Sequence, residues 1–186
     1  IRFDNNTGFW LNGENIKIKG VCNHQDHAGV GVAVPDALWE FRLRKLKEMG
    51  VNAYRVAHNP VAKEFMAACD SMGIMVLDEN RLFNTSPEYV RQLEWQVRRD
   101  RNCPSVILWS VFNEEPMQGT ENGVEMVRRM YDVVKKMDPT RPITAAMNGG
   151  FFSEYNVSQA VDVGGFNYQI ESYDRFHEEN PDLPLT

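Results

Sequence analysis

The stretch ILWSVFNEEP, residues 107–116, joins a long apolar run to an abrupt polar end. Asn113, Glu114 and Glu115 stand side by side where the apolar run stops. A carboxyl group at the rim of a buried strand is a candidate general acid, because it can give a proton to a reacting group in the cleft beside it. The simpler interpretation is a turn, since Asn and Pro favour turns.

Polar side chains also follow the other apolar runs of the chain. Because chemistry in parallel α/β folds collects at the carboxyl ends of strands, we expect these residues to share one cleft. They are rich in hydrogen-bonding groups and lack a glycine-rich phosphate loop, which suits a polyhydroxylated ligand better than a nucleotide. The set comprises Asn23, His24, Asp26, His27, Arg55, His58, Asn59, Asp78, Glu79, Asn80, Asn113, Glu114, Glu115, Asn148, Asn167 and Tyr168.

Short apolar runs alternate with amphipathic stretches along the whole chain. Strands are predicted at residues 16–22, 51–57, 74–78, 107–113, 143–147 and 161–168, with the start of a seventh at 183–186. Helices are predicted between them. The helix that starts at Asp36 should bury Leu38, Phe41, Leu46 and Met49. If the strands close into a barrel, Trp109 is expected in its interior.

Strand–helix alternation predicts a parallel sheet covered by helices. An open doubly wound sheet would carry GxGxxG after its first strand, and GVCNHQDHAGVG does not fit that pattern. A complete (β/α)8 TIM barrel needs roughly 250 residues. We therefore predict an α/β fold that is an incomplete TIM barrel of about six βα units plus the start of strand seven, forming a single domain over residues 1–186.

The net charge of −6 argues against a nucleic-acid or membrane-surface partner, both of which call for a basic face. No apolar run approaches the roughly 20 residues of a membrane span. Cys22, Cys69 and Cys103 form no CxxC pair, so we expect buried small side chains rather than a disulfide framework or zinc site. The protein is expected to be soluble, and its compartment stays open between cytoplasm, periplasm and exterior.

Several motifs resemble those of glycoside hydrolase family 2, which contains β-galactosidases, β-glucuronidases and β-mannosidases. NAYRVAHNPVAKEFMAACDSMGIMVLDEN resembles its long first signature, and SVILWSVFNEE resembles its second. KIKGVCNHQDH is similar to the first barrel strand of the family, and DPTRPIT is similar to the entry of the fifth. The resemblance implies a catalytic barrel with two glutamates, one after strand four and one after strand seven.

The resemblance also implies roles for individual residues. Glu114 would be the acid/base of a retaining mechanism, in which a second carboxylate attacks the anomeric carbon. Asn113 would bind the sugar 2-hydroxyl, and Arg55 would orient the nucleophile. His24, His58 and Tyr168 would contact the sugar or lie near the nucleophile, whereas Glu115 has no such role in the family.

The nucleophile is expected beyond Thr186, because Glu171, Glu178 and Glu179 lie on the preceding helical segment. The chain should therefore be part of a longer glycoside hydrolase and inactive alone. No cofactor is expected, and no magnesium either, because Phe83 and Thr85 occupy the positions of the magnesium ligands in metal-dependent relatives. An open barrel also predicts self-association through its exposed edges.

A terminal β-galactoside is the expected substrate. A β-glucuronidase or β-mannosidase of the same family is the enzymatic alternative, and a non-catalytic carbohydrate-binding barrel is another. A further alternative is a metal-dependent hydrolase that uses His24, Asp26 and His27 with Asp78 or Glu79 as a converging ligand.

Overall fold

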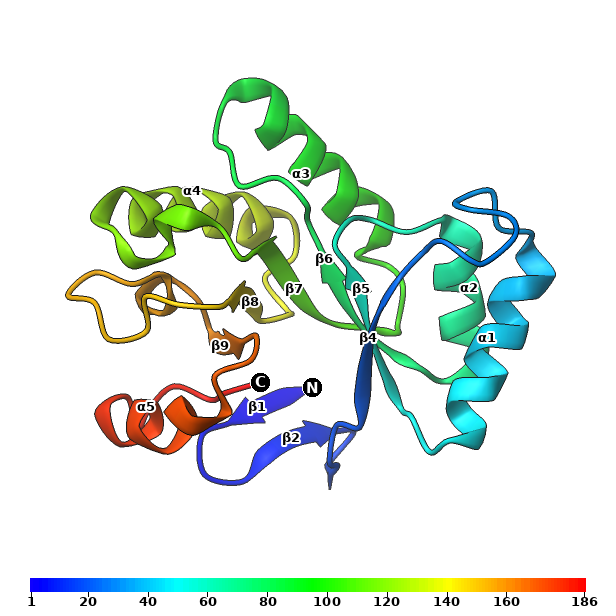
Figure 1. Ribbon diagram of the computed structural model, residues 1–186, viewed down its shortest axis with the longest axis horizontal. Helices are drawn as coiled ribbons and strands as arrows, with labels where there is room; N and C mark the ends of the chain where they lie inside the picture. The colour runs from blue at the N-terminus through cyan, green and yellow to red at the C-terminus, as the bar shows by residue number, and fades with distance from the viewer.

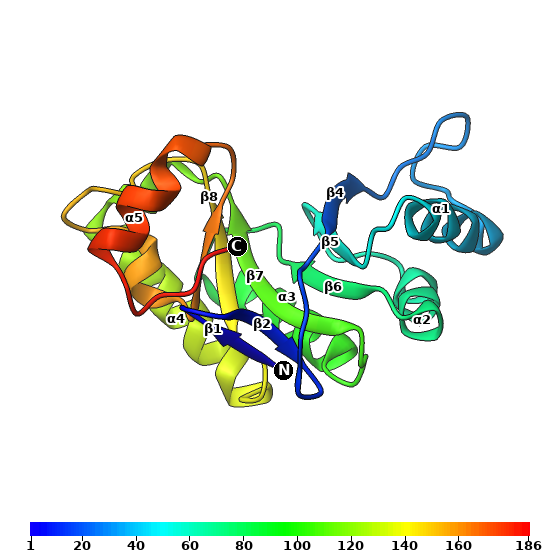
Figure 2. The same ribbon diagram turned by 90° about the horizontal axis from the view of Figure 1, so that it is seen from below.

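The computed structural model describes residues 1–186 and contains a six-stranded parallel sheet in strict sequence order. Figures 1 and 2 show the sheet curved, with the helices on its outer side. A doubly wound sheet would instead reverse its strand order at a switch point. The predicted α/β fold, an incomplete TIM barrel, is therefore confirmed. The strands are β4 (Gly20–His24), β5 (Ala53–Ala57), β6 (Met75–Glu79), β7 (Val106–Asn113), β8 (Ile143–Met147) and β9 (Val163–Phe166).

The predicted start of a seventh strand is also present, since Leu185 forms a parallel bridge with Gly164 of β9. Helices lie between the strands, as predicted, and two of their ends carry residues that commonly stop or start a helix. Gly73 ends α2 with a φ of +67°, and the Thr120 hydroxyl caps α4 by accepting a bond from the Gly123 N–H at 3.1 Å. The helices are α1 (Asp36–Glu48), α2 (Lys63–Met72), α3 (Pro87–Asp100), α4 (Glu121–Met137) and α5 (Tyr173–Glu179), with 3-10 turns η1 (Pro116–Gly119), η2 (Val157–Ala160) and η3 (Ile170–Ser172).

The larger hydrophobic core lies between the sheet and these helices. On α1 the buried side chains are Trp39 and Leu43, which are one turn apart. The predicted face was partly wrong, because Phe41 and Met49 are 47% and 75% exposed. None of the helices is long and apolar enough to cross a membrane.

A small antiparallel sheet at the N-terminus was not predicted. It consists of β1 (Arg2–Asp4), β2 (Gly8–Leu11) and β3 (Glu14–Asn15). Its Phe9 packs in a second apolar cluster with side chains near the amino ends of the barrel strands, which are Ala53, Met75, Ile107, Leu108 and Val163. The small sheet therefore covers the end of the half-barrel opposite the polar residues.

Candidate active site

Arg55 and Glu79 form the base of a polar network inside the half-barrel. Arg55, at the third position of β5, donates from Nε and Nη2 to the two carboxylate oxygens of Glu79 at 2.8 and 2.9 Å. The Ser110 hydroxyl and His58 Nδ1 contact the same carboxylate at 2.8 and 2.7 Å. Glu79 is completely buried, so these donors replace the water that its charge has lost.

Asn113 joins the network through an irregularity in β7. Its Oδ1 accepts a hydrogen bond from Arg55 Nη2 at 2.6 Å. Ser110 points into the same space, although residues three apart on a regular strand face opposite sides. The pairing of β7 with β8 shifts register between Ser110 and Asn113, and such a bulge re-aims the side chains that follow it.

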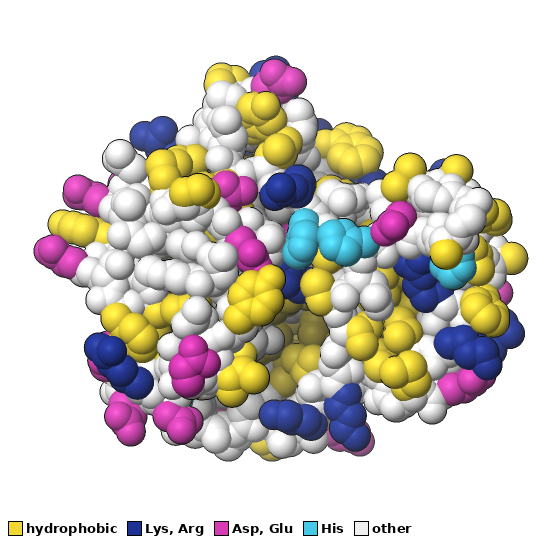
Figure 3. All heavy atoms as spheres, viewed as in Figure 1, with side chains coloured by type: hydrophobic (Ala, Val, Ile, Leu, Met, Phe, Trp, Pro, Cys, Tyr) yellow, Lys and Arg dark blue, Asp and Glu magenta, His cyan; other side chains and the backbone are white.

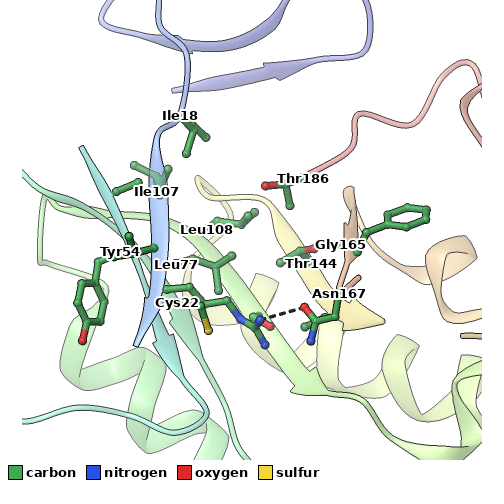
Figure 4. Close-up of a pocket in the computed structure, with 17 residues that line it drawn as sticks. Ile18, Cys22, Tyr54, Leu77, Ile107, Leu108, Thr144, Gly165, Asn167 and Thr186 are labelled. Atoms are coloured by element: carbon green, nitrogen blue, oxygen red, sulfur yellow. Dashed lines mark hydrogen bonds between the residues drawn. The ribbon is translucent and has the colours of Figure 1, made fainter. Parts of the chain in front are cut away.

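Asn167, which follows β9, connects the network to Glu114. Its Nδ2 donates to Asn113 Oδ1 at 2.8 Å and to Glu114 Oε1 at 2.6 Å. Its Oδ1 accepts from Arg55 Nη1 at 3.0 Å, the bond drawn dashed in Figure 4. Asn113 Oδ1 thus accepts two protein hydrogen bonds, and its Nδ2 remains available to a ligand.

Glu114 adopts a left-handed backbone conformation, with a φ of +53°. This conformation is unfavourable for residues other than glycine, and such residues cluster at functional sites. It turns Glu114 toward Asn167 and toward Asn148, whose Nδ2 lies 3.3 Å from Oε2. Glu115 points elsewhere and lies 3.6 Å from Arg81. The two carboxylates therefore diverge, because the backbone turns at Glu114.

Two histidines and a tyrosine stand at the rim of this network. The rings of His24 and His58 meet edge to face, with centroids 5.1 Å apart. Because Glu79 can only accept, His58 Nδ1 must carry the hydrogen of their shared bond. Tyr168 is 70% exposed, and the nearby Glu114 carboxylate raises the pKa of its phenol. Figure 3 shows histidine side chains beside the hollow at the centre of this face.

Below the polar network the lumen is a cavity of about 220 Å³ with mostly apolar walls. Figure 4 shows Ile18, Leu77 and Leu108 around it. Trp109 was expected in this interior, and that prediction was wrong. Its indole N–H donates to Asp138 at 2.9 Å, and the ring packs in the core shared with the helices. Alternation along β7 sends Leu108 inward and Trp109 outward.

The residues of the metal-hydrolase alternative do not gather into a ligand set. His27 Nδ1 lies 3.2 Å from Arg42 Nη2, and the structure forms no group of three His, Cys, Asp or Glu side chains suited to a metal ion. Phe83, at one position where a magnesium ligand would align, packs on Phe112 with ring centroids 4.5 Å apart. The polar network of Arg55, Glu79, Asn113, Glu114 and Asn167 is therefore the strongest candidate site.

The family model described as "Glycosyl hydrolases family 2, TIM barrel domain" matches residues 3–86 and 83–182. The chain belongs to glycoside hydrolase family 2. A solved structure of a family 2 member from Bacteroides cellulosilyticus superimposes with a TM-score of 0.93 at 33% sequence identity, over 99% of this chain and 25% of that one.

Two curated relatives carry different activity names. The chain is 35% identical to "Beta-galactosidase BoGH2A" of Bacteroides ovatus, over 98% of this chain and 27% of that protein. It is 33% identical to a "Beta-glucuronidase" of Bacteroides fragilis, over 98% of this chain and 29% of the relative. The chain thus spans little more than a quarter of each relative, and membership of the family makes it a glycosidase region without selecting the sugar.

Proposed function

We propose that residues 1–186 supply the acid/base side of the active site of a retaining exo-β-glycosidase. The observation that carries the proposal is the placement of Glu114. Two side-chain amides, from Asn148 and Asn167, hold its carboxyl group beside Asn113 and the Arg55 network. This network supports the roles that the family resemblance implies for Glu114, Asn113 and Arg55.

In the proposed first step, Glu114 transfers its proton to the glycosidic oxygen while the bond from that oxygen to the anomeric carbon breaks. A second carboxylate attacks the anomeric carbon and forms a glycosyl–enzyme ester. In the second step, water gives a proton to Glu114 and its oxygen displaces the carboxylate. Asn113 Nδ2 donates to the sugar 2-hydroxyl, and this hydrogen bond strengthens as positive charge develops on the ring.

Neither of the other two carboxylates near Glu114 is suited to act as the nucleophile. Glu79 is completely buried and already accepts from Arg55, His58 and Ser110. Glu115 turns toward Arg81. We therefore propose that the nucleophile belongs to a part of a longer polypeptide outside residues 1–186, and that these residues alone do not turn over substrate.

We propose a terminal β-galactoside as substrate. The name of the Bacteroides ovatus relative supports it. A β-glucuronide has equal support from the names of other relatives and is the second candidate.

Kinetics on aryl glycosides test the proposal. A longer polypeptide that contains this chain should hydrolyse 4-nitrophenyl β-galactoside with retained anomeric configuration, and more efficiently than the β-glucuronide. Glu114→Gln should abolish turnover, whereas Glu115→Gln should retain it. A reversed sugar preference would select the glucuronidase. Binding of the sugar without turnover would favour a carbohydrate-binding barrel. Turnover by residues 1–186 alone would contradict the proposal that the nucleophile lies outside them.

A further inference from the structure

We propose that Gln118 is a positioning residue that fixes the side-chain amide of Asn148 so that it can only donate to Glu114. Gln118 lies in η1, two residues after Pro116 of the NEEP sequence, and is 7% exposed. Its side chain forms hydrogen bonds with Asn148 and none with Glu114. No role was predicted for Gln118 from the sequence.

The orientations of the Gln118 and Asn148 side-chain amides follow from the backbone N–H of Asn148, which can only donate. It donates to the Gln118 side chain at 2.9 Å, so the atom that receives it must be Oε1. Gln118 Nε2 then faces Asn148 and must donate to Oδ1. Asn148 is left with Nδ2 toward Glu114 Oε2, at 3.3 Å. Reversing either amide would set two donors or two acceptors against each other.

Close packing of two loops brings Gln118 against Asn148. A Cβ atom built on Gly150 would lie 2.7 Å from the Gly119 Cα atom, so a side chain there would collide with the opposite backbone. On the other side of η1, a Cβ atom on Gly123 would lie 2.0 Å from the Met117 carbonyl oxygen. The turn that carries Gln118 is thus held between α4 and the loop after β8.

The two oxygens of Glu114 are consequently unequal. Oε1 accepts a 2.6 Å bond from Asn167, whereas Oε2 accepts the longer 3.3 Å bond from Asn148. The less strongly bonded oxygen is the better carrier of a proton. Because Asn148 presents only N–H groups to Oε2, it cannot take that proton, which remains available for transfer out of the protein. This last step depends on the proposed function, but the amide orientation does not.

Nuclear magnetic resonance of residues 1–186 tests the orientation without any substrate. The side-chain NH₂ signals of Asn148 should move with pH as Glu114 ionises, and Glu114→Gln should remove that movement. Tyr168 and Cys22 also titrate close to Glu114, but the pKa of each is raised, above about 10 and about 9, so neither will mimic the effect.

Gln118→Glu is the decisive substitution because it keeps the shape and replaces the amide donor by a charged acceptor oxygen. A carboxylate at 118 accepts from both the backbone N–H and Nδ2 of Asn148, so the amide should reverse and its NH₂ signals should stop following Glu114. Gln118→Ala should weaken the response, and the exposed Gln159→Glu is the matched control. An unchanged Asn148 response in a folded Gln118→Glu protein would overturn the proposal.

The leaving group of the substrate provides the catalytic test, in the longer polypeptide. Gln118→Glu should reduce kcat/KM at least about tenfold for alkyl β-galactosides, whose leaving oxygen needs protonation. It should leave kcat/KM nearly unchanged for a dinitrophenyl β-galactoside, which needs none. Equal losses on both substrates would overturn the positioning role. If the unsubstituted longer polypeptide has no glycosidase activity but the Asn148 NH₂ signals still follow Glu114, the proposed function is wrong and the amide orientation stands.

Discussion

Glu79 is a fully buried carboxylate held by a two-bond ion pair with Arg55, at 2.8 and 2.9 Å. Removing one partner of such a pair leaves an uncompensated charge away from water. We expect Glu79→Gln to reduce the free energy of unfolding by about 3–5 kcal/mol, measured by urea denaturation. Glu115→Gln, which disturbs only the looser pair with Arg81, should cost less than about 1 kcal/mol. Similar losses in the two variants would contradict this account.

Asn113 should act in the transition state through the sugar 2-hydroxyl. Loss of one such donor reduces kcat by roughly 10²–10³-fold in comparable sites, and we expect this scale for Asn113→Ala in the longer polypeptide. With a 2-deoxy substrate the same substitution should have little effect, because the hydroxyl is already absent. A full loss on the 2-deoxy substrate would indicate that Asn113 acts only by holding Arg55 and Asn167 in place.

A pair of buried aspartates should make stability depend on pH. Burial, and then the charge of Asp100, raise the pKa of Asp78 well above its ordinary value of 3.8. Below pH 3.8 both the folded and the unfolded chain carry this proton. As pH rises, the unfolded chain loses it first, and stability falls by about 1.4 kcal/mol for each unit by which the two pKa values differ.

The substitution Asp78→Asn removes that titration while keeping an acceptor for the Gln96 amide, which donates to Asp78 at 2.9 Å. Its free energy of unfolding should exceed that of the unsubstituted protein at pH 7, with the advantage shrinking toward pH 4. Urea denaturation across this range measures the difference. Asp132→Asn, on the exposed side of α4, serves as the control. A constant difference at every pH would show that Asp78 is ionised in the folded protein.

Two adjacent glycines offer a matched comparison at the contact between loops. Gly150 has a φ of +73°, and an added Cβ would lie 2.7 Å from Gly119, whereas an added Cβ on Gly149 meets nothing within 4 Å. Gly150→Ala should destabilise the protein by about 1–3 kcal/mol. Gly149→Ala should stay within about 0.5 kcal/mol. Thermal unfolding checks both, and equal shifts would show that the loops separate easily.

The exposed edges of the half-barrel should promote association. β4 pairs on one side only, with β5, and its Gly20, Cys22 and His24 are exposed. Light scattering over a concentration series should give a mass that rises above the 21.4 kDa of one chain. A constant monomer mass at every concentration would contradict the prediction.

The sequence predicted the sheet and much of the site because both depend on local patterns. Apolar runs mark the barrel strands, and part of the predicted polar set, including His58 and Glu114, does converge. Asp78 instead turns toward Gln96, and Asp26 and His27 lie beside Arg42. His24 and Tyr168 reach the same rim, and their contacts with a sugar stay predictions.

The remaining parts depend on tertiary relations that no local pattern carries. Glu79, Asn113 and Asn167 were expected in the cleft, but their contacts with one another were not predicted. The contacts of Glu79 depend on the alignment of β6 with its neighbours, those of Asn113 on a bulge that has no sequence mark, and those of Asn167 on the strands that bring it beside Arg55 and Glu114. The N-terminal sheet was missed because its strands have only two to four residues, too few for an alternating pattern to be recognised.

The four hydrogen bonds to the Glu79 carboxylate also affect which alignment of the strands is stable. Its donors come from β5, from the residue after that strand and from β7, so all must be in place before the charge is satisfied. Sliding β7 by one residue would turn the Ser110 hydroxyl toward the helices and leave Glu79 short of a donor. The buried charge thus disfavours misaligned strands, because a misaligned barrel would leave the Glu79 carboxylate buried without enough hydrogen-bond donors.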